Sequence, residues 1–254
     1  MGVLRDISFR LTGRRAASPK SAAAGAVCLA MALATGLVSC DSGDVYPPPP
    51  EVSKRQVNAS FSFEGLGAFP ESEYYQVVFA AFAEGSVYPL TYKAVTKPSS
   101  GNVEVSLANI PDEAGTVSLA LLDKGKKLVF DFYSYPVADM GDETITLTQQ
   151  EITLYSYARV QKQIFDIKCT ACHGAGESSA RGLDLTAGHS YAALVNRNST
   201  KAPSELLVMP YSASRSFLIE ALTVLNILTP DHTEIVKTDD TGLLREWIAN
   251  GCPE

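Results

Sequence analysis

In this chain of 254 residues, two cysteines and a histidine have a spacing at which they could do chemistry together: Cys169, Cys172 and His173. The spacing C-x-x-C-H puts two thiols on one side of a single turn, where both can reach vinyl groups on one edge of a flat macrocycle. A histidine directly after the second cysteine then lies beneath the iron and supplies an axial nitrogen. The pattern therefore predicts covalent haem attachment through both cysteines, with His173 as an iron ligand.

Three other interpretations of the two cysteines fit less well. A structural zinc site usually has four ligands, and Cys252 and His232 would have to complete the set at an unusual spacing. A thioredoxin-like dithiol needs a βαβ setting, whereas a helical pattern precedes Cys169. A disulfide between Cys169 and Cys172 is the simplest alternative in an exported protein. Cys252 is then expected to be a buried free thiol.

The second axial ligand is less clearly marked. His232 is the first candidate and would give the iron two histidine ligands. Met209 is the alternative, and no methionine follows it in the chain. A third possibility is a five-coordinate iron with one open face. The choice has consequences, because methionine ligation raises the reduction potential and an open face admits small ligands. His189 is expected to be solvated rather than a ligand.

The first forty residues have the composition of an export signal. Basic residues extend to Lys20, an apolar stretch covers residues 22–38, and Ser39-Cys40 ends it. This end resembles the lipobox of bacterial lipoproteins, which implies cleavage and lipid attachment at Cys40. A membrane-spanning helix is the alternative. We predict a signal peptide over residues 1–39 and a Pro-rich tether over residues 40–54, stiffened by the run Pro47–Pro50.

The charge of the exported part disfavours one class of partner. Of 21 basic and 28 acidic residues, five and one lie in the first 39 positions, which leaves 16 and 27 and a net charge near −11. A surface of this sign repels phosphate backbones, so nucleic-acid binding is not expected. A basic protein partner is compatible with it, and the oligomeric state is left open.

Residues 55–154 have the pattern of β-structure. Polar and apolar residues alternate over 57–63 and 103–107, and a longer apolar run covers 74–83. A turn at residues 123–126 separates two further apolar runs, and shorter ones follow at 145–147 and 152–154. About seven short strands predict an antiparallel β-sandwich. The segment resembles the immunoglobulin-like or transthyretin-like modules of exported lipoproteins, without a residue-specific motif.

From residue 155 the period becomes helical, with Tyr157, Val160, Ile164 and Phe165 on one face. The region 155–254 resembles the cytochrome c domains of planctomycete and Bacteroidetes exported proteins. The resemblance depends on the haem motif and on three further segments. Its most specific parts are the haem motif and the terminal pattern L-x-x-W-I-x-x-G, which lies in the last segment. The segments are residues 182–185, residues 210–218 and residues 243–251. It implies an all-α cytochrome c domain, in which Trp247 packs near Phe165. The whole chain is thus predicted to be multidomain.

These features predict a lipid-anchored c-type cytochrome of the cell envelope that carries electrons to or from a redox partner protein. The anchor would hold it on the inner or outer membrane, periplasmic or surface-exposed. An enzymatic activity is less expected than electron transfer. Two alternatives stay open: a haem domain with an open coordination position for catalysis or sensing, and a binding or scaffold lipoprotein whose sandwich domain recruits a partner.

Overall fold

The computed structural model describes residues 53–176 and 179–254, which belong to one compact unit. The predicted signal peptide, the lipidation site Cys40 and nearly all of the tether lie outside the described residues. Among the helices that the structure describes, none is long and apolar enough to cross a membrane.

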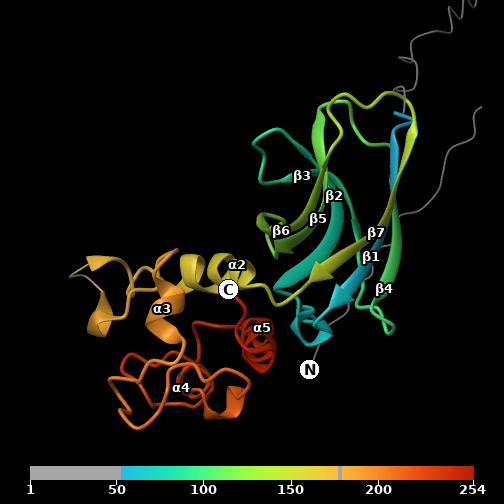
Figure 1. Cartoon of the computed structure of the whole chain (residues 1–254). Coiled ribbons are helices and arrows are strands. Elements are labelled where there is room, and N and C mark those ends of the chain that lie inside the picture. The colour runs from blue at the N-terminus through green and yellow to red at the C-terminus, as the bar shows by residue number, and fades with distance from the viewer. Residues whose placement is uncertain (1–52, 177–178) are drawn as a thin grey trace, which may run out of the picture. The chain divides into compact units, whose positions relative to one another are not determined.

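The first part of the described chain is a two-layered sandwich of β-strands (Figure 1). One sheet has three strands in the order β4-β1-β7, and the other has four in the order β3-β2-β5-β6. The strands are β1 (Gln56–Glu64), β2 (Tyr75–Ala83), β3 (Pro89–Ala94), β4 (Asn102–Ala108), β5 (Ala114–Asp123), β6 (Leu128–Pro136) and β7 (Thr144–Thr153). A short 3-10 helix, η1 (Leu66–Ala68), follows β1.

The alternating sequence of β1 explains its place in the sandwich. Val57, Ala59, Phe61 and Phe63 are buried, whereas the residues between them are partly exposed. Phe61 meets the ring of Phe79 from the opposite sheet edge-on, with ring centroids 5.7 Å apart, a favourable aromatic geometry. The β-sandwich predicted for residues 55–154 is therefore present.

Two details of the sandwich differ from the sequence prediction. It is not purely antiparallel, because β1 pairs with β7 in parallel and with β4 antiparallel. Strand β3 was not predicted, since it starts at a proline and its side chains are mostly exposed, as in many edge strands. The two apolar runs predicted near residues 145 and 152 form the single strand β7.

The four-stranded sheet is coiled so strongly that part of its outer face is covered. The N–H of Leu128 at the start of β6 donates to the carbonyl of Val87 in the β2–β3 connection, at 2.8 Å. A second small core lies beneath this contact and includes Val78, Phe82 and Leu122. Because both faces of β2 are buried, its sequence is an unbroken apolar run rather than an alternation.

The prediction of an all-α cytochrome c domain over residues 155–254 is wrong, and the described chain is mostly β-structure. This region holds only short helices joined by turns, and two isolated β-bridges, Val195–Val208 and Asn198–Leu206. The helices are α2 (Tyr157–Val160), the π-helix η2 (Gln161–Cys169), the 3-10 helices η4 (Ala180–Gly182) and η5 (Ala213–Arg215), α3 (Ser190–Leu194), α4 (Phe217–Thr223) and α5 (Thr238–Ala249). Frequent glycine, proline and serine between residues 174 and 216 interrupt helical periodicity there.

One hydrophobic core is continuous from the sandwich into the C-terminal region. Ile164 and Phe165 of η2 are buried on the predicted helical face, and Trp247 of α5 is completely buried. Tyr157 connects them, because its ring lies 6.4 Å from that of Phe165 and 5.2 Å from that of Trp247. The predicted domain boundary at residue 154 falls between the end of β7 and the start of α2.

Candidate functional site

The predicted haem motif occupies the turn that ends η2. Cys169 is the last residue of this helix, and its carbonyl accepts the N–H groups of Cys172 at 3.1 Å and His173 at 2.8 Å. The two thiols and the imidazole are therefore carried by one turn of backbone. Cys169 is half-buried and Cys172 is exposed, and neither forms a disulfide.

The chain after the motif is held close to this turn. A Cβ atom at Gly174 would lie 2.9 Å from the carbonyl oxygen of Thr170, which is closer than real Cβ contacts allow. The carbonyl of Cys172 accepts the N–H of Ala180, and that of His173 accepts the N–H of Leu185, both at 2.8 Å. Close packing therefore requires glycine at position 174. The hydrogen bonds from Ala180 and Leu185 hold the turn in place.

His232 approaches His173 from a loop 59 positions further along the chain. The two ring centroids are 6.2 Å apart and the ring planes are inclined by 44°. Asp231 shapes the loop, because its carboxylate accepts the N–H of Thr233 at 2.9 Å and that of Asn226 at 3.2 Å. These hydrogen bonds, chiefly that from Thr233, hold the pKa of Asp231 below its usual range.

The hydrogen bonding of His232 leaves one ring nitrogen available. Its Nδ1 lies 2.7 Å from the carbonyl oxygen of Pro230, and since a carbonyl only accepts, Nδ1 carries the proton. Nε2 is then unprotonated in the neutral ring and can bind a metal. A metal-bound histidine normally donates its other N–H in this way, which fixes the tautomer and the ring orientation.

The separation of the two imidazoles fits a shared metal. With a metal–nitrogen bond of about 2 Å and a nitrogen about 1 Å from its ring centre, two imidazoles on opposite sides of one ion have centroids about 6 Å apart. The centroids of His173 and His232 are 6.2 Å apart. In contrast to His232, Nδ1 of His173 is buried without a hydrogen-bond partner. The residues present therefore fit a haem with two histidine ligands.

Apolar side chains on the segment around His232 are unusually exposed. The exposed fractions are 47% for Val224, 67% for Leu225 and 36% for Ile235. Ile167, two residues before Cys169, is 60% exposed. Exposed large apolar side chains near candidate ligands in the sequence are compatible with a cofactor site, where a flat apolar group would cover them.

Burial favours the neutral forms of Cys169 and His173. Burial raises the pKa of the Cys169 thiol to about 11. Burial lowers the pKa of His173, against a smaller opposite effect from backbone groups of Ala180 and Leu183. A neutral imidazole is the form that binds a metal, so His173 is in the right protonation state at neutral pH.

The other residues considered from the sequence lie in different settings. Met209 is half-buried, and its N–H donates to the hydroxyl of Ser216 at 2.9 Å. The side chain of His189 is 69% exposed, with Nδ1 4.0 Å from Asp184. Cys252 is a buried free thiol. Among the residues that the structure describes, no three His, Cys, Asp or Glu side chains gather as a metal-binding group.

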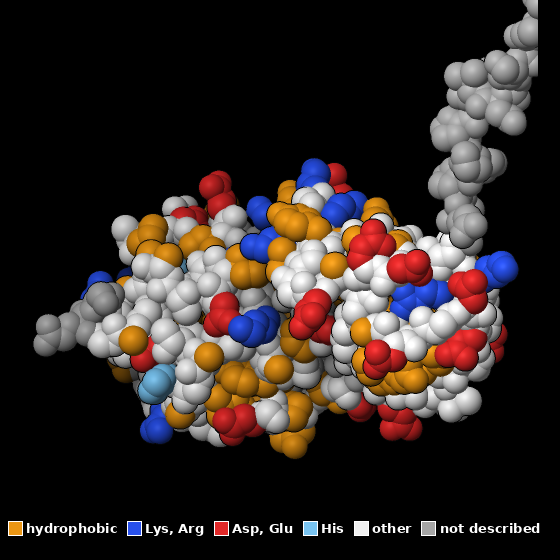
Figure 2. Space-filling model, turned by 90° about the horizontal axis from the view of Figure 1, so that it is seen from above, with side chains coloured by type: hydrophobic (Ala, Val, Ile, Leu, Met, Phe, Trp, Pro, Cys, Tyr) orange, Lys and Arg blue, Asp and Glu red, His pale blue; other side chains and the backbone are white. Residues whose placement is uncertain are grey.

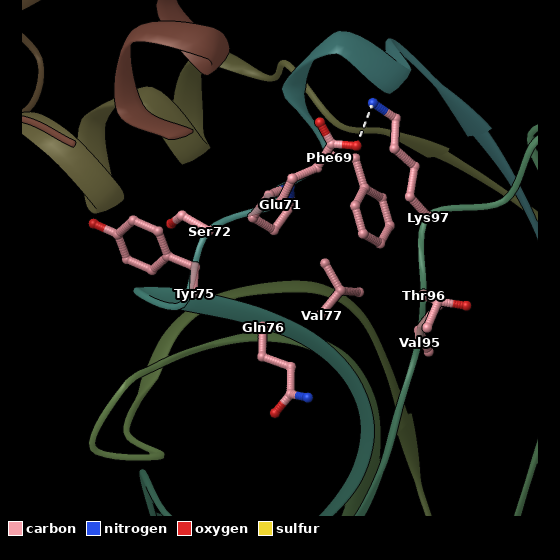
Figure 3. Close-up of a pocket in the computed structure, with 10 residues that line it drawn as sticks. Phe69, Glu71, Ser72, Tyr75, Gln76, Val77, Val95, Thr96 and Lys97 are labelled. Carbon is pink, nitrogen blue, oxygen red and sulfur yellow. Dashed lines mark ion pairs between the residues drawn. The ribbon is translucent and has the colours of Figure 1, made fainter. Parts of the chain in front are cut away.

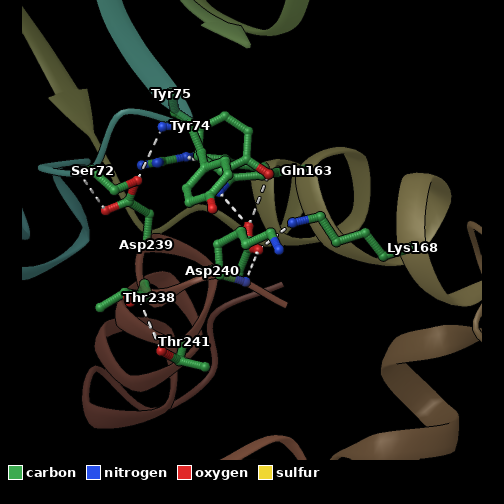
Figure 4. Close-up of polar contacts among 11 residues, drawn as sticks. Ser72, Tyr74, Tyr75, Gln163, Lys168, Thr238, Asp239, Asp240 and Thr241 are labelled. Carbon is green, nitrogen blue, oxygen red and sulfur yellow. Dashed lines mark hydrogen bonds and ion pairs between the residues drawn. The ribbon is translucent and has the colours of Figure 1, made fainter. Parts of the chain in front are cut away.

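A buried polar cluster next to the motif was not predicted. The carboxylate of Asp240, at the start of α5, is fully buried. It accepts hydrogen bonds from the amide of Gln163 at 2.9 Å and the hydroxyl of Tyr75 at 3.1 Å, and it forms an ion pair with Lys168 (Figure 4). These partners come from η2 and β2, so one carboxylate joins both to α5. Lys168 directly precedes Cys169, and the cluster therefore fixes the end of the helix that carries the motif.

Arg159 extends this polar cluster into the sandwich. The guanidinium is completely buried and donates to the carbonyls of Ala68 at 2.9 Å and Leu154 at 2.7 Å, and to the side chain of Gln163 at 2.9 Å. Burial lowers its pKa to about 10, so it stays charged at neutral pH. The sequence carries no clear signal for the cluster, because Tyr75 and Asp240 are 165 positions apart.

An open groove of about 320 Å³ lies on the sandwich side of this cluster (Figure 3). Phe69, Val77 and Val95 form its apolar floor, and an ion pair between Lys97 and Glu71 at 3.2 Å stands at its rim. The residues that line the groove include no nucleophile–base pair, and the groove lies apart from the residues of the haem motif.

Comparison of the chain with family models, with curated proteins and with solved structures finds no match. The resemblance to exported cytochrome c domains therefore stays a prediction made from the motifs alone.

Proposed function

We propose that this protein is an electron carrier that binds one haem covalently through Cys169 and Cys172, with His173 and His232 as the axial ligands. The observation that carries the proposal is the 6.2 Å separation of the two imidazoles, one of which directly follows the second cysteine. When bound, the haem supplies an iron that cycles between the ferrous and ferric states.

Each side chain has a separate task in this proposal. Cys169 and Cys172 would hold the haem covalently through their sulfur atoms. His173 and His232 would hold its iron through their imidazole nitrogens. Pro230 orients the second imidazole through its carbonyl, 2.7 Å from Nδ1. Asp240 holds the end of η2 and so positions Cys169.

Two axial histidines favour electron transfer over the alternative of an open coordination site. If both histidines hold the iron, these two side chains would exclude oxygen, peroxide and carbon monoxide from it. The reduction potential is expected to be lower than with a methionine ligand. The proposal further includes export, a lipid anchor on Cys40 in the cell envelope, and a redox partner protein.

The decisive experiment is expression of the full chain in a bacterium that attaches haem to exported proteins. Mass spectrometry of the denatured protein should show one haem bound covalently, and the double substitution Cys169→Ala/Cys172→Ala should abolish it. Cys252→Ala is the matched control and should retain the haem. A wild-type chain without bound haem would refute the proposal.

The axial ligands are tested by spectroscopy of the loaded protein. His232→Ala should open one position, so that carbon monoxide binds to the ferrous form, whereas the wild type should resist it. His189→Ala is the control, because this exposed histidine should not affect the spectrum. Rapid carbon monoxide binding by the wild type would favour the open-site alternative.

A further inference from the structure

We infer that the sandwich has a second functional surface, at which three tyrosine or leucine side chains and three lysines contact an anionic lipid membrane. We name it the Tyr–Lys face, and it consists of Tyr88, Leu90, Tyr92, Lys124, Lys126 and Lys127. It lies in residues 88–127, apart from the haem motif, so the inference is independent of the proposed electron transfer.

The fold brings the two parts of this face together. Leu90 and Tyr92 belong to the edge strand β3, and the lysines belong to the β5–β6 hairpin. The hydrogen bond from Leu128 to Val87 links the two segments at 2.8 Å. Figure 1 shows the β2–β3 connection and this hairpin on the same side of the sandwich. The ammonium group of Lys126 lies 5.3 Å from the ring centre of Tyr92, so this lysine borders one aromatic side chain of the face directly.

The apolar side chains of this face are exposed to an unusual degree. Tyr88 is 55% exposed, and Leu90 and Tyr92 are each 40% exposed. They stand on the outside of the second small core, whose own residues are almost completely buried. Tyrosine is favoured at the boundary between lipid and water, because its ring is apolar and its hydroxyl is polar. A cluster of this kind on a strand edge is therefore suited to the headgroup region.

The lysines give the face three positive charges, and the acidic Glu73 and Asp123 lie beside them. Three lysines lie within residues 124–127, although the chain after position 39 has a net charge near −11. Lys124 pairs with Glu73 at 3.2 Å, and Lys126 donates to the neutral amide of Gln76 at 2.9 Å. Among the described residues, Lys126 and Lys127 have no ion-pair partner. Figure 2 shows Lys or Arg side chains beside hydrophobic ones along one edge of the molecule, with Asp or Glu side chains among them.

This combination favours an anionic membrane over a second copy of the chain. Two acidic molecules repel each other, and a lysine on an edge strand opposes strand-to-strand pairing; Lys93 of β3 is exposed. Anionic lipids instead attract each nearby lysine. Contact at this face would add to any anchor upstream in the chain, since stable membrane attachment commonly needs two signals.

The test compares lysine reactivity in the full chain reconstituted with phosphatidylglycerol or with phosphatidylcholine vesicles. Acetylation by a water-soluble reagent is followed at each lysine by mass spectrometry. Lys126 and Lys127 should react roughly fivefold more slowly with phosphatidylglycerol, whereas the exposed Lys201 should react equally in both. Added salt should remove the protection, because it screens the attraction.

Variants distinguish membrane contact from contact between two copies of the chain. The double substitution Leu90→Ser/Tyr92→Ser should reduce the protection of Lys126 and Lys127, and Lys201→Glu should leave it unchanged. Equal reactivity with both lipids would overturn the inference. Protection that depends on protein concentration and not on lipid would also overturn it, and would indicate contact between two copies.

Discussion

The sandwich and the C-terminal region fold by different means. In the sandwich, long strands satisfy their own backbone groups through ladders, and alternating residues form the core. In the C-terminal region the longest helix has 12 residues and most others have fewer than eight. Helices this short are not stable alone, so the second region depends on packing against the first. The residues with chemistry lie in the region that is less able to stand alone.

The largest effect is expected from Trp247→Ala, which removes the largest buried side chain. Truncating a buried tryptophan lowers the free energy of unfolding by about 3–5 kcal/mol. The C-terminal region should be destabilised more than the sandwich, because Trp247 belongs to α5. Urea unfolding followed by circular dichroism measures it. If the substitution uncouples the unfolding of the two regions, the variant should unfold in two steps, whereas the wild type should unfold in one. A variant as stable as the wild type would show that α5 contributes little.

Asp240→Asn tests the polar connection between the two regions. The amide leaves Lys168 without its ionic partner and places an N–H₂ group among donors, which should cost about 2–3 kcal/mol. The same urea experiment measures the loss, with Asp139→Asn, an exposed position, as the control. Haem attachment to the turn should also become less complete. Equal stability of Asp240→Asn and Asp139→Asn would contradict a supporting role for the cluster.

Raising the pH should destabilise the C-terminal core, because the buried Cys252 thiol resists losing its proton. Burial raises the pKa of this thiol to about 11, from the usual value near 9. Between pH 9 and 11 the Cys252 thiol loses its proton more readily in the unfolded chain than in the folded one. The free energy of unfolding therefore falls as pH rises. The loss should reach about 2 kcal/mol near pH 11. Cys252→Ala should show a smaller decrease over this interval in unfolding experiments, and an identical pH profile would exclude the effect.

The smallest effect is expected from Gly174→Ala at the turn. The new methyl group would meet the carbonyl oxygen of Thr170, and such overpacking costs about 1–2 kcal/mol. The thiols and the imidazole of His173 should also shift relative to each other. Gly141→Ala is the control, because a Cβ there meets nothing within 4 Å. The fraction of chains with bound haem should fall for the first variant only.

The sequence predicted those features that depend on neighbouring residues. Alternation located β1 and β4, and the apolar run located β2. The helical face leading to Cys169 was also predicted, and Ile164 and Phe165 are buried on it. Strand β3 was not predicted, because this exposed edge strand begins with Pro89 and has no buried face that would produce an alternation of polar and apolar residues.

Features formed between distant residues could not be predicted in the same way. The parallel pairing of β1 with β7 depends on the path of the chain between them and not on the sequence of either strand. The short, irregular helices replace the all-α domain because tertiary packing, and not periodicity, fixes residues 179–237. His232 was a candidate from its residue type, but its approach to His173 depends on the loop that Asp231 shapes. The contacts of Asp240 with Tyr75 and Lys168 had no local signal.

Arg159 has a consequence for any attempt to transplant the haem motif. Its guanidinium supplies donors to the carbonyls of Ala68 and Leu154, which belong to the sandwich side of the junction. A fragment starting at residue 155 would carry this charge without those acceptors, and the remaining sandwich would keep two carbonyls without donors. The motif and its supporting turn therefore cannot be transferred alone, and a working graft would have to include η1 and the end of β7, which Arg159 holds.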